Sequence, residues 1–494
     1  MRSSGVLMHI SSLPSPYGIG TMGREAFRFI DFLKKAGQSY WQLLPICPTS
    51  FGDSPYQSFS GYAGNSYFID LELLCEEGLL TREECESYNW GEDKSQVDYE
   101  KIYFNRNKLL HKVYEVFKEK KPTDFDSFCE SQKTWLEDYT LFMALKEINQ
   151  GKAWMDWEEP LKRREPAALE DVKHVCANEI CFWKMVQYLF FKQWDALKTY
   201  AHENGIQIIG DVPIYVAADS VDVWSEPEQF YLDEDLRMID VAGCPPDVYA
   251  VKGQLWGNPL FNWDKMKEDQ YAWWTRRIAY MSKLYDVVRV DHFRGFDSYY
   301  AIPAKDKDAV NGEWRKGPGM ELFHALEKKL GKQNIIVEDL GFLTDSVRKL
   351  VKDTGFPGMK LVQFGFNGGC EDGDYLPHNY DKHCVVYTGT HDNDTILGWM
   401  NQASEESAAF AKEYLRLSEE EGYNWGMMRA AWSSVGELAI VTMQDLLGLG
   451  SEARMNIPST LGCNWKWRVV PGQITEELAE KTAKYVRLYG RSPQ

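Results

Sequence analysis

Paired cysteines are missing from this sequence of 494 residues, which holds ten cysteines at scattered positions and no C-x-x-C motif. Disulfide frameworks and zinc sites need cysteines at close, regular spacings, whereas cytosolic enzymes carry single reduced thiols. We therefore expect free thiols and no zinc site.

Long apolar runs are missing as well. His9 interrupts the only apolar stretch near the start of the chain, so residues 1–12 do not resemble the core of a secretion signal. No segment reaches the ~18 consecutive apolar residues that a membrane helix needs. Together with the single cysteines, these absences predict a cytoplasmic protein without a membrane partner.

Positive charge is scarce, because 55 lysines and arginines face 74 acidic residues and the formal net charge is −19. Such a surface repels phosphate backbones and anionic lipids, so nucleic acid is not expected as a partner. Residues 253–257 contain two glycines but lack the Lys-Ser/Thr of a phosphate-binding loop. Nucleotide sugars are therefore not indicated as substrates.

Aromatic residues, by contrast, are abundant, with 18 Trp, 27 Tyr and 24 Phe. Most of them should form core, as in any globular protein. Others occur in polar loops rich in glycine and proline, such as residues 249–256. Flat rings pack against the C–H faces of sugars while polar neighbours bond the hydroxyls, so this pattern is typical of a carbohydrate site.

Short apolar runs alternate with longer amphipathic stretches, which predicts buried parallel strands joined by crossover helices. The eight expected strands are residues 5–9, 40–45, 206–211, 287–291, 335–338, 359–366, 384–388 and 438–443. The clearest expected helices are residues 25–36, 190–203, 320–330 and 345–353, three of them followed by a glycine that can end a helix, at Gly37, Gly205 and Gly331. Eight such units favour a closed (β/α)8 TIM barrel, with an open doubly wound sheet as the alternative.

Two intervals are too long for simple connections. Residues 51–201 predict a large, mainly helical insertion after strand 2. Residues 220–275 contain several prolines and predict a loop-rich insertion after strand 3 that covers the site. The barrel itself would comprise residues 1–50, 202–219 and 276–494.

Acidic residues end several of the expected strands, where barrel enzymes carry their reacting groups. Asp291 ends the fourth strand, and Arg289 points to the same side because side chains alternate. A buried arginine would keep that aspartate ionised, as a nucleophile requires. Glu338 ends the fifth strand and would stay protonated until the nucleophile has reacted.

Asp211 ends the third strand, and the seventh leads into His391 and Asp392. Each acid alone could instead cap the next helix or pair with a basic neighbour. Several acids on different strands fit glycoside transfer better, because one carboxylate attacks the anomeric carbon while another protonates the leaving oxygen.

Ordered motifs extend along almost the whole chain, at residues 9–14, 17–20, 41–45, 54–57, 210–216, 242–247, 253–259, 289–295, 338–341, 388–395 and 454–458. In these motifs the sequence resembles the 4-alpha-glucanotransferases of the amylomaltase, or disproportionating enzyme, family in the α-amylase clan. The resemblance implies a retaining double displacement with Asp291 as nucleophile, Glu338 as general acid/base and Asp392 holding sugar hydroxyls. The partners that it implies are an α-1,4-glucan donor and a sugar acceptor. No cofactor or metal is expected, because carboxylates can stabilise the sugar cation.

The resemblance also implies a set of substrate-binding residues, which are Ser54, Tyr56, Asp211, Gln254, Trp256, Arg289, His391 and Asn464. Gln254 and Trp256 would lie on a loop that covers the glucan. The sequence departs from the family at Ser459 and Cys463, close to Asn464, and at residues 249–251 of the cover loop. A hydrolase of the same clan and a glucan-binding protein without activity are the alternative functions.

Overall fold

Eight parallel strands form a closed barrel in the computed structural model, which describes residues 2–50, 52–246, 250–341, 343–367 and 370–493. In their order around the barrel, the strands are β1 (Ser3–Leu7), β12 (Leu438–Thr442), β11 (Cys384–Tyr387), β10 (Gly358–Leu361), β9 (Ile335–Val337), β6 (Val287–Val290), β3 (Gln207–Val212) and β2 (Tyr40–Gln42). Pairing of β1 with both β2 and β12 closes the ring. The TIM-barrel prediction is confirmed, and every expected run contributes a strand.

The sixth predicted strand is too long. Residues 359–366 were expected to be extended, but β10 ends at Leu361 and residues Val362–Phe366 form a 3-10 helix. Four of its five residues are buried, as are Met359 and Leu361 of the strand. Because a short apolar run has no distinctive periodicity, the sequence cannot separate a buried strand from a buried helical turn.

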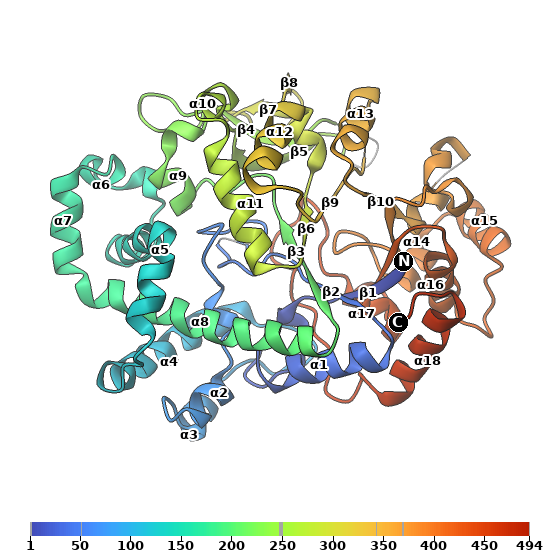
Figure 1. Ribbon diagram of the computed structural model, residues 1–494, viewed down its shortest axis with the longest axis horizontal. Coiled ribbons are helices and arrows are strands. Elements are labelled where there is room, and N and C mark those ends of the chain that lie inside the picture. Colours follow the sequence, from blue (N-terminus) through green and yellow to red (C-terminus); the bar gives the residue numbers. More distant parts are fainter. Residues whose placement is uncertain (1, 51, 247–249, 342, 368–369, 494) are drawn as a thin grey trace.

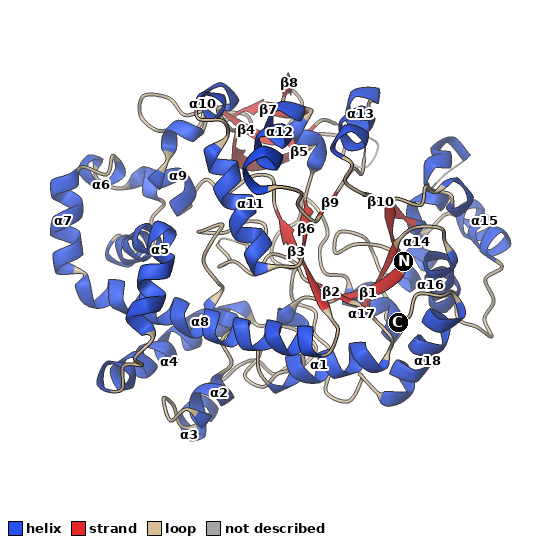
Figure 2. Ribbon diagram, viewed as in Figure 1, coloured by secondary structure: helices blue, strands red, loops and turns tan. Residues whose placement is uncertain are grey.

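Crossover helices surround the barrel (Figure 1 and Figure 2). The helices of the barrel half of the chain are α1 (Arg24–Lys35), α11 (Ala272–Leu284), α12 (Met320–Leu330), α13 (Asp345–Thr354), α14 (Ile396–Gln402), α15 (Glu405–Leu415), α16 (Tyr423–Ser433), α17 (Met443–Leu447) and α18 (Glu476–Leu488). The glycines expected to end helices all have a positive φ, which favours glycine, with values of 69° at Gly37, 73° at Gly205 and 72° at Gly331.

The segment between β2 and β3 is mostly helical and forms the left side of the molecule in Figure 1. Its helices are α2 (Leu71–Glu76), α3 (Arg82–Glu86), α4 (Tyr99–Glu119), α5 (Phe125–Ile148), α6 (Glu159–Lys162), α7 (Pro166–Val175) and α8 (Ala177–Glu203). The expected helix 190–203 is only the second half of α8, whose 27 residues run from the insertion back to β3. One continuous helix thus joins the insertion to the barrel.

The interval after β3 contains more regular structure than the loop-rich segment we expected. Its helices α9 (Val221–Ser225) and α10 (Trp263–Glu268) flank β4 (Asp240–Cys244) and β5 (Gln254–Pro259). These strands join β7 (Ser298–Pro303) and β8 (Glu313–Lys316), which follow β6, in an antiparallel sheet of order β5-β4-β7-β8. Local sequence patterns miss this sheet because its strands come from two separate connections.

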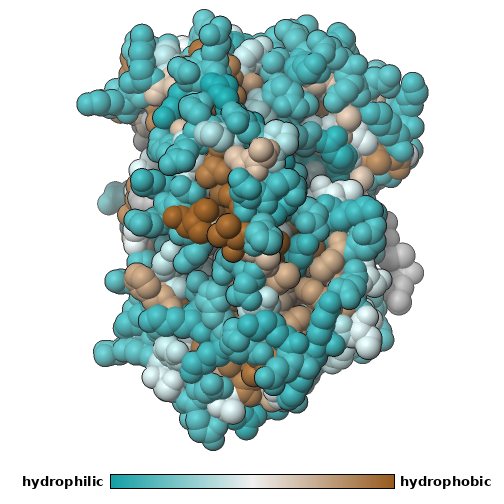
Figure 3. Space-filling view, turned by 90° about the vertical axis from the view of Figure 1, so that its left-hand side faces the viewer, coloured by the Kyte–Doolittle hydropathy of each residue, from teal (hydrophilic) through white to brown (hydrophobic). Residues whose placement is uncertain are grey.

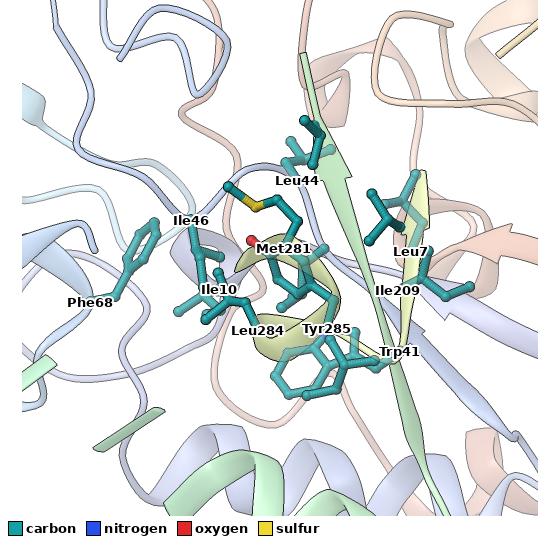
Figure 4. Packing of buried hydrophobic residues seen from close by; sticks show 14 of the residues in the cluster. Leu7, Ile10, Trp41, Leu44, Ile46, Phe68, Ile209, Met281, Leu284 and Tyr285 are labelled. Carbon is teal, nitrogen blue, oxygen red and sulfur yellow. The ribbon is translucent and has the colours of Figure 1, made fainter. Parts of the chain in front are cut away.

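The core continues from the barrel strands into the layer of helices. Figure 4 shows Leu7, Trp41 and Ile209, from three neighbouring strands, beside Met281 and Leu284 of α11. Trp41 is fully buried, and its indole N–H donates to the backbone oxygen of Met8 at 2.7 Å. The polar atom of this large ring is therefore satisfied inside an apolar environment.

The outer surface is mainly hydrophilic. On the face shown in Figure 3, apolar residues gather only in limited patches between polar side chains. Within the described part of the chain, no helix has the length and apolar character needed to cross a membrane.

Gly210 in β3 is expected to tolerate no side chain. A Cβ atom there would lie 2.1 Å from Cδ2 of Tyr285, whose ring is buried. We predict that Gly210→Ala lowers the free energy of unfolding by about 1–3 kcal/mol, the usual cost of overpacking, as measured by urea denaturation. Adding Tyr285→Leu should recover part of this loss, and strictly additive effects of the two substitutions would contradict the steric explanation.

Candidate active site

The barrel register brings the predicted acids to one end of three neighbouring strands. Asp211 of β3 pairs in register with Arg289 of β6, and Val290 of β6 pairs with Val337 of β9. Asp291 follows Val290 and Glu338 follows Val337, so the two acids lie at the same position along their neighbouring strands. The backbone continues the ladder, because the Asp291 N–H donates to Val212 at 3.0 Å and the Glu338 N–H donates to Val290 at 3.0 Å.

The Arg289 guanidinium lies at the centre of these acids and is only 2% exposed. Its Nη1 is 2.5 Å from Asp211 Oδ2 and 3.2 Å from Asp291 Oδ1, while Nη2 is 2.8 Å from Glu338 Oε2. One cation therefore contacts three carboxyl groups. Full ionisation would leave two uncompensated negative charges in a buried site, which favours retention of a proton.

The pKa values of Asp291 and Glu338 are shifted in opposite directions. Burial, and then the neighbouring Glu338, raise the pKa of Asp291 well above its usual value. Burial alone would also raise the pKa of Glu338, but Arg289, a hydrogen bond from Asp291 and the His292 N–H lower it to about 2. These directions are the reverse of the expected order, in which the aspartate stays ionised and the glutamate keeps its proton. The sequence could not show that the guanidinium lies closer to the glutamate.

Tyr56, from the insertion after β2, links the acids to the end of β11. Its hydroxyl donates to Asp211 Oδ2 at 2.9 Å and lies 3.3 Å from His391 Nδ1. The two rings are stacked, with centroids 4.8 Å apart. His391 Nε2 is in turn 3.4 Å from Asp392 Oδ1. One chain of contacts thus runs from Arg289 to Asp392.

Asp392 is the most open of these acids, with 46% of its side chain exposed. Asn456 Nδ2 donates to its Oδ1 at 2.6 Å, and Arg454 Nη2 donates to its backbone oxygen at 2.6 Å. Arg454 and Asn456 belong to the motif at residues 454–458, but the sequence alone predicted no role for them. Their position in a motif after the last strand was the available signal.

A further residue that the sequence analysis left without a role is His292, next to Asp291. It has a left-handed backbone, with φ of 48°, and its N–H donates to Glu338 Oε2 at 3.1 Å. Burial lowers the pKa of this imidazole to about 4, so the ring is neutral at neutral pH. Non-glycine residues in this conformation are uncommon and often occur at functional sites.

The small antiparallel sheet contacts the site through Trp256. Trp256 of β5 meets the His292 ring edge to face at 4.8 Å, and its Nε1 donates to Gln254 Oε1 at 3.1 Å. Trp256 therefore lies beside His292, whose N–H donates to Glu338, and Gln254 is bonded to Trp256. Residues 247–249, including the departure expected at Tyr249, lie outside the described residues.

Ser54 and Asn464 contact the site less directly. The Ser54 hydroxyl accepts the Tyr56 N–H at 3.2 Å, so it orients the backbone of Tyr56. Asn464 bonds within its own loop, accepting the Ile457 N–H at 3.0 Å. In that loop Ser459 has φ of 65°, a conformation that favours glycine, so the departure from the family places strain of roughly 1–2 kcal/mol there.

Known proteins resemble the chain over nearly its whole length. A family model described as 4-alpha-glucanotransferase matches residues 8–473. A 4-alpha-glucanotransferase of Clostridium butyricum is 51% identical over 98% of this chain and 100% of its own. One of Thermus thermophilus is 47% identical over 96% of both chains.

Two solved structures of amylomaltases also resemble the chain. An amylomaltase from Streptococcus agalactiae in complex with acarbose superimposes with a TM-score of 0.98, at 42% identity over 100% of both chains. An amylomaltase from Corynebacterium glutamicum shares the fold, with a TM-score of 0.77 at 18% identity over 98% of this chain and 75% of its own.

The position of the retained proton can be measured by NMR on protein labelled with ¹³C at the side-chain carboxyls. We predict that the resonance lost in Asp291→Asn has the shift of a protonated carboxyl at neutral pH, whereas the resonance lost in Glu338→Gln has the shift of an ionised one. Arg289 and the His292 N–H stabilise the glutamate charge, which is the reason for this order. The opposite assignment would contradict it.

Proposed function

The chain belongs to the 4-alpha-glucanotransferase family, and from this membership we propose that it moves α-1,4-glucan segments between maltooligosaccharide, starch or glycogen chains by a retaining double displacement. Small donors would release glucose. The observation that carries the proposal is the pair of partly buried carboxyls that follow adjacent strands, Asp291 and Glu338, both held by the buried Arg289. Retaining enzymes need two carboxyl groups about 5 Å apart on either side of the bond that breaks.

In the first half-reaction, the Asp291 carboxylate attacks the anomeric carbon while Glu338 gives its proton to the departing glucan oxygen. In the free site the pKa directions favour this proton on Asp291, and donor binding would transfer it to Glu338. The hydrogen bond between the two side chains provides the route. The products are a covalent glucosyl-aspartate, an ionised Glu338 and a shortened glucan.

In the second half-reaction, the hydroxyl of an acceptor sugar gives its proton to Glu338 and attacks the glucosyl-aspartate, which frees Asp291. Asp392 would bond hydroxyls of the distorted sugar ring and is oriented by Asn456. Arg289 stays charged throughout, because arginine keeps its proton under all ordinary conditions.

Tyr56, Asp211 and His391 form one side of the site and would surround the donor sugar. Trp256, which contacts His292, and Gln254, which is bonded to Trp256, would line the acceptor position. An aromatic acceptor site favours a sugar over water by binding energy, which directs the intermediate to transfer. The acarbose complex of the S. agalactiae amylomaltase supports a glucan-like ligand for this fold.

Product analysis from pure maltotriose tests the proposal. We predict glucose and longer maltodextrins at a constant number of reducing ends, because transfer makes one glycosidic bond for each bond broken. Glu338→Gln should lower kcat by at least a thousandfold, since general acid/base assistance contributes about 10²–10⁴-fold and acts in both steps. Reducing ends that increase steadily with time would instead identify a hydrolase.

A further inference from the structure

The loop between β11 and α14 carries His391 and Asp392, and a single buried side chain holds both of its ends. Asp445 Oδ2 accepts the hydroxyl of Thr388, the first residue after β11, at 2.8 Å. Asp445 Oδ1 accepts the backbone N–H of Ile396, the first residue of α14, at 2.8 Å. Asp445 and both of these partners are buried.

Asp445 is itself fixed from several directions. It lies in the first turn of α17, where its own N–H donates to the Thr442 hydroxyl at 3.2 Å. Its backbone oxygen accepts from Asn424 Nδ2 of α16 at 2.8 Å. The carboxylate therefore extends from a rigid part of the barrel and does not move with the loop that it holds.

A buried carboxylate is costly, and this one has no basic partner among the described residues. Burial raises the pKa of Asp445 to about 6, although the Ile396 N–H and the Thr388 hydroxyl oppose the shift. A fold that needed only packing at this position could use an apolar residue. The cost points to a geometric role, because two acceptor oxygens on one planar group fix the separation of the two loop ends.

We propose that Asp445 is a positioning residue for the transfer reaction, setting the place of Asp392 by tying Thr388 and Ile396 to the same carboxylate. The inference rests on the proposed function of Asp392. Asn456 and Arg454 hold Asp392 from one side, and Asp445 holds the base of its loop. Loss of Asp445 lets the loop move as a unit, so Asp392 reaches the sugar less often in its productive position.

Asp445→Ala is the first test. We expect kcat for maltotriose, per folded molecule, to fall at least tenfold with KM changed less than threefold, because an interaction made mainly in the transition state is lost. Asp445→Asn should stay within threefold of wild type, since its oxygen can accept from Ile396 while its NH2 donates to the rotated Thr388 hydroxyl. Thr388→Val, which leaves the Ile396 bond, should give an intermediate loss and serves if Asp445→Ala does not fold.

Asp70 offers a matched control. It is also buried, and it accepts a threonine hydroxyl, from Thr21 at 2.5 Å, and a backbone N–H, from Leu73 at 2.9 Å. It caps α2 in the helical insertion. Asp70→Ala should lower the melting temperature while kcat per folded molecule stays within twofold of wild type. An equal kcat loss in Asp70→Ala and Asp445→Ala would overturn the proposal.

Hydrogen exchange gives a second readout that does not require activity. Peptides covering residues 388–396 should exchange at least tenfold faster in Asp445→Ala than in wild type or Asp70→Ala. Unchanged exchange, a kcat within twofold of wild type, or an Asp445→Asn variant as slow as Asp445→Ala would each overturn the positioning role. Failure of the proposed function would look different, because the wild-type protein would then not lengthen maltotriose.

Discussion

The site depends on one buried cation. Arg289 holds Asp211 and Asp291 with one terminal nitrogen and Glu338 with the other. Because a guanidinium is planar and rigid, it fixes the spacing of Asp291 and Glu338 as well as compensating their charge. A lysine would supply the charge as a single point and could not hold the acids in two separate directions.

The barrel alone does not complete this site. Tyr56 comes from the segment after β2 and Trp256 from the small antiparallel sheet, and each contacts a residue that follows a barrel strand, His391 or His292. Segments far apart in the sequence therefore converge on Arg289 and its acids. Barrel enzymes gain new chemistry through such connections, while the strands keep the reacting groups in register.

Much of the barrel and of the candidate site could be predicted from the sequence. Buried parallel strands appear as apolar runs, and the acidic residues at their carboxyl ends indicate the site. The antiparallel sheet was not predicted, because its central pairing joins β4 to β7, which lie in separate connections before and after β6 and leave no common local pattern. His292 was missed because its role depends on a left-handed backbone, and Asn456 because its role depends on a contact across the barrel end. The opposite pKa shifts of Asp291 and Glu338 could not be predicted without the distances from Arg289 to both acids.

The most direct measurement is to trap the covalent intermediate. The Glu338→Gln variant would be incubated with an activated glucosyl donor that does not need acid assistance to leave, and the digested protein would be analysed by mass spectrometry. With Asp291 as the nucleophile, we predict one glucosyl unit attached to Asp291. A label on another carboxylate, or turnover without any labelled protein, would contradict it.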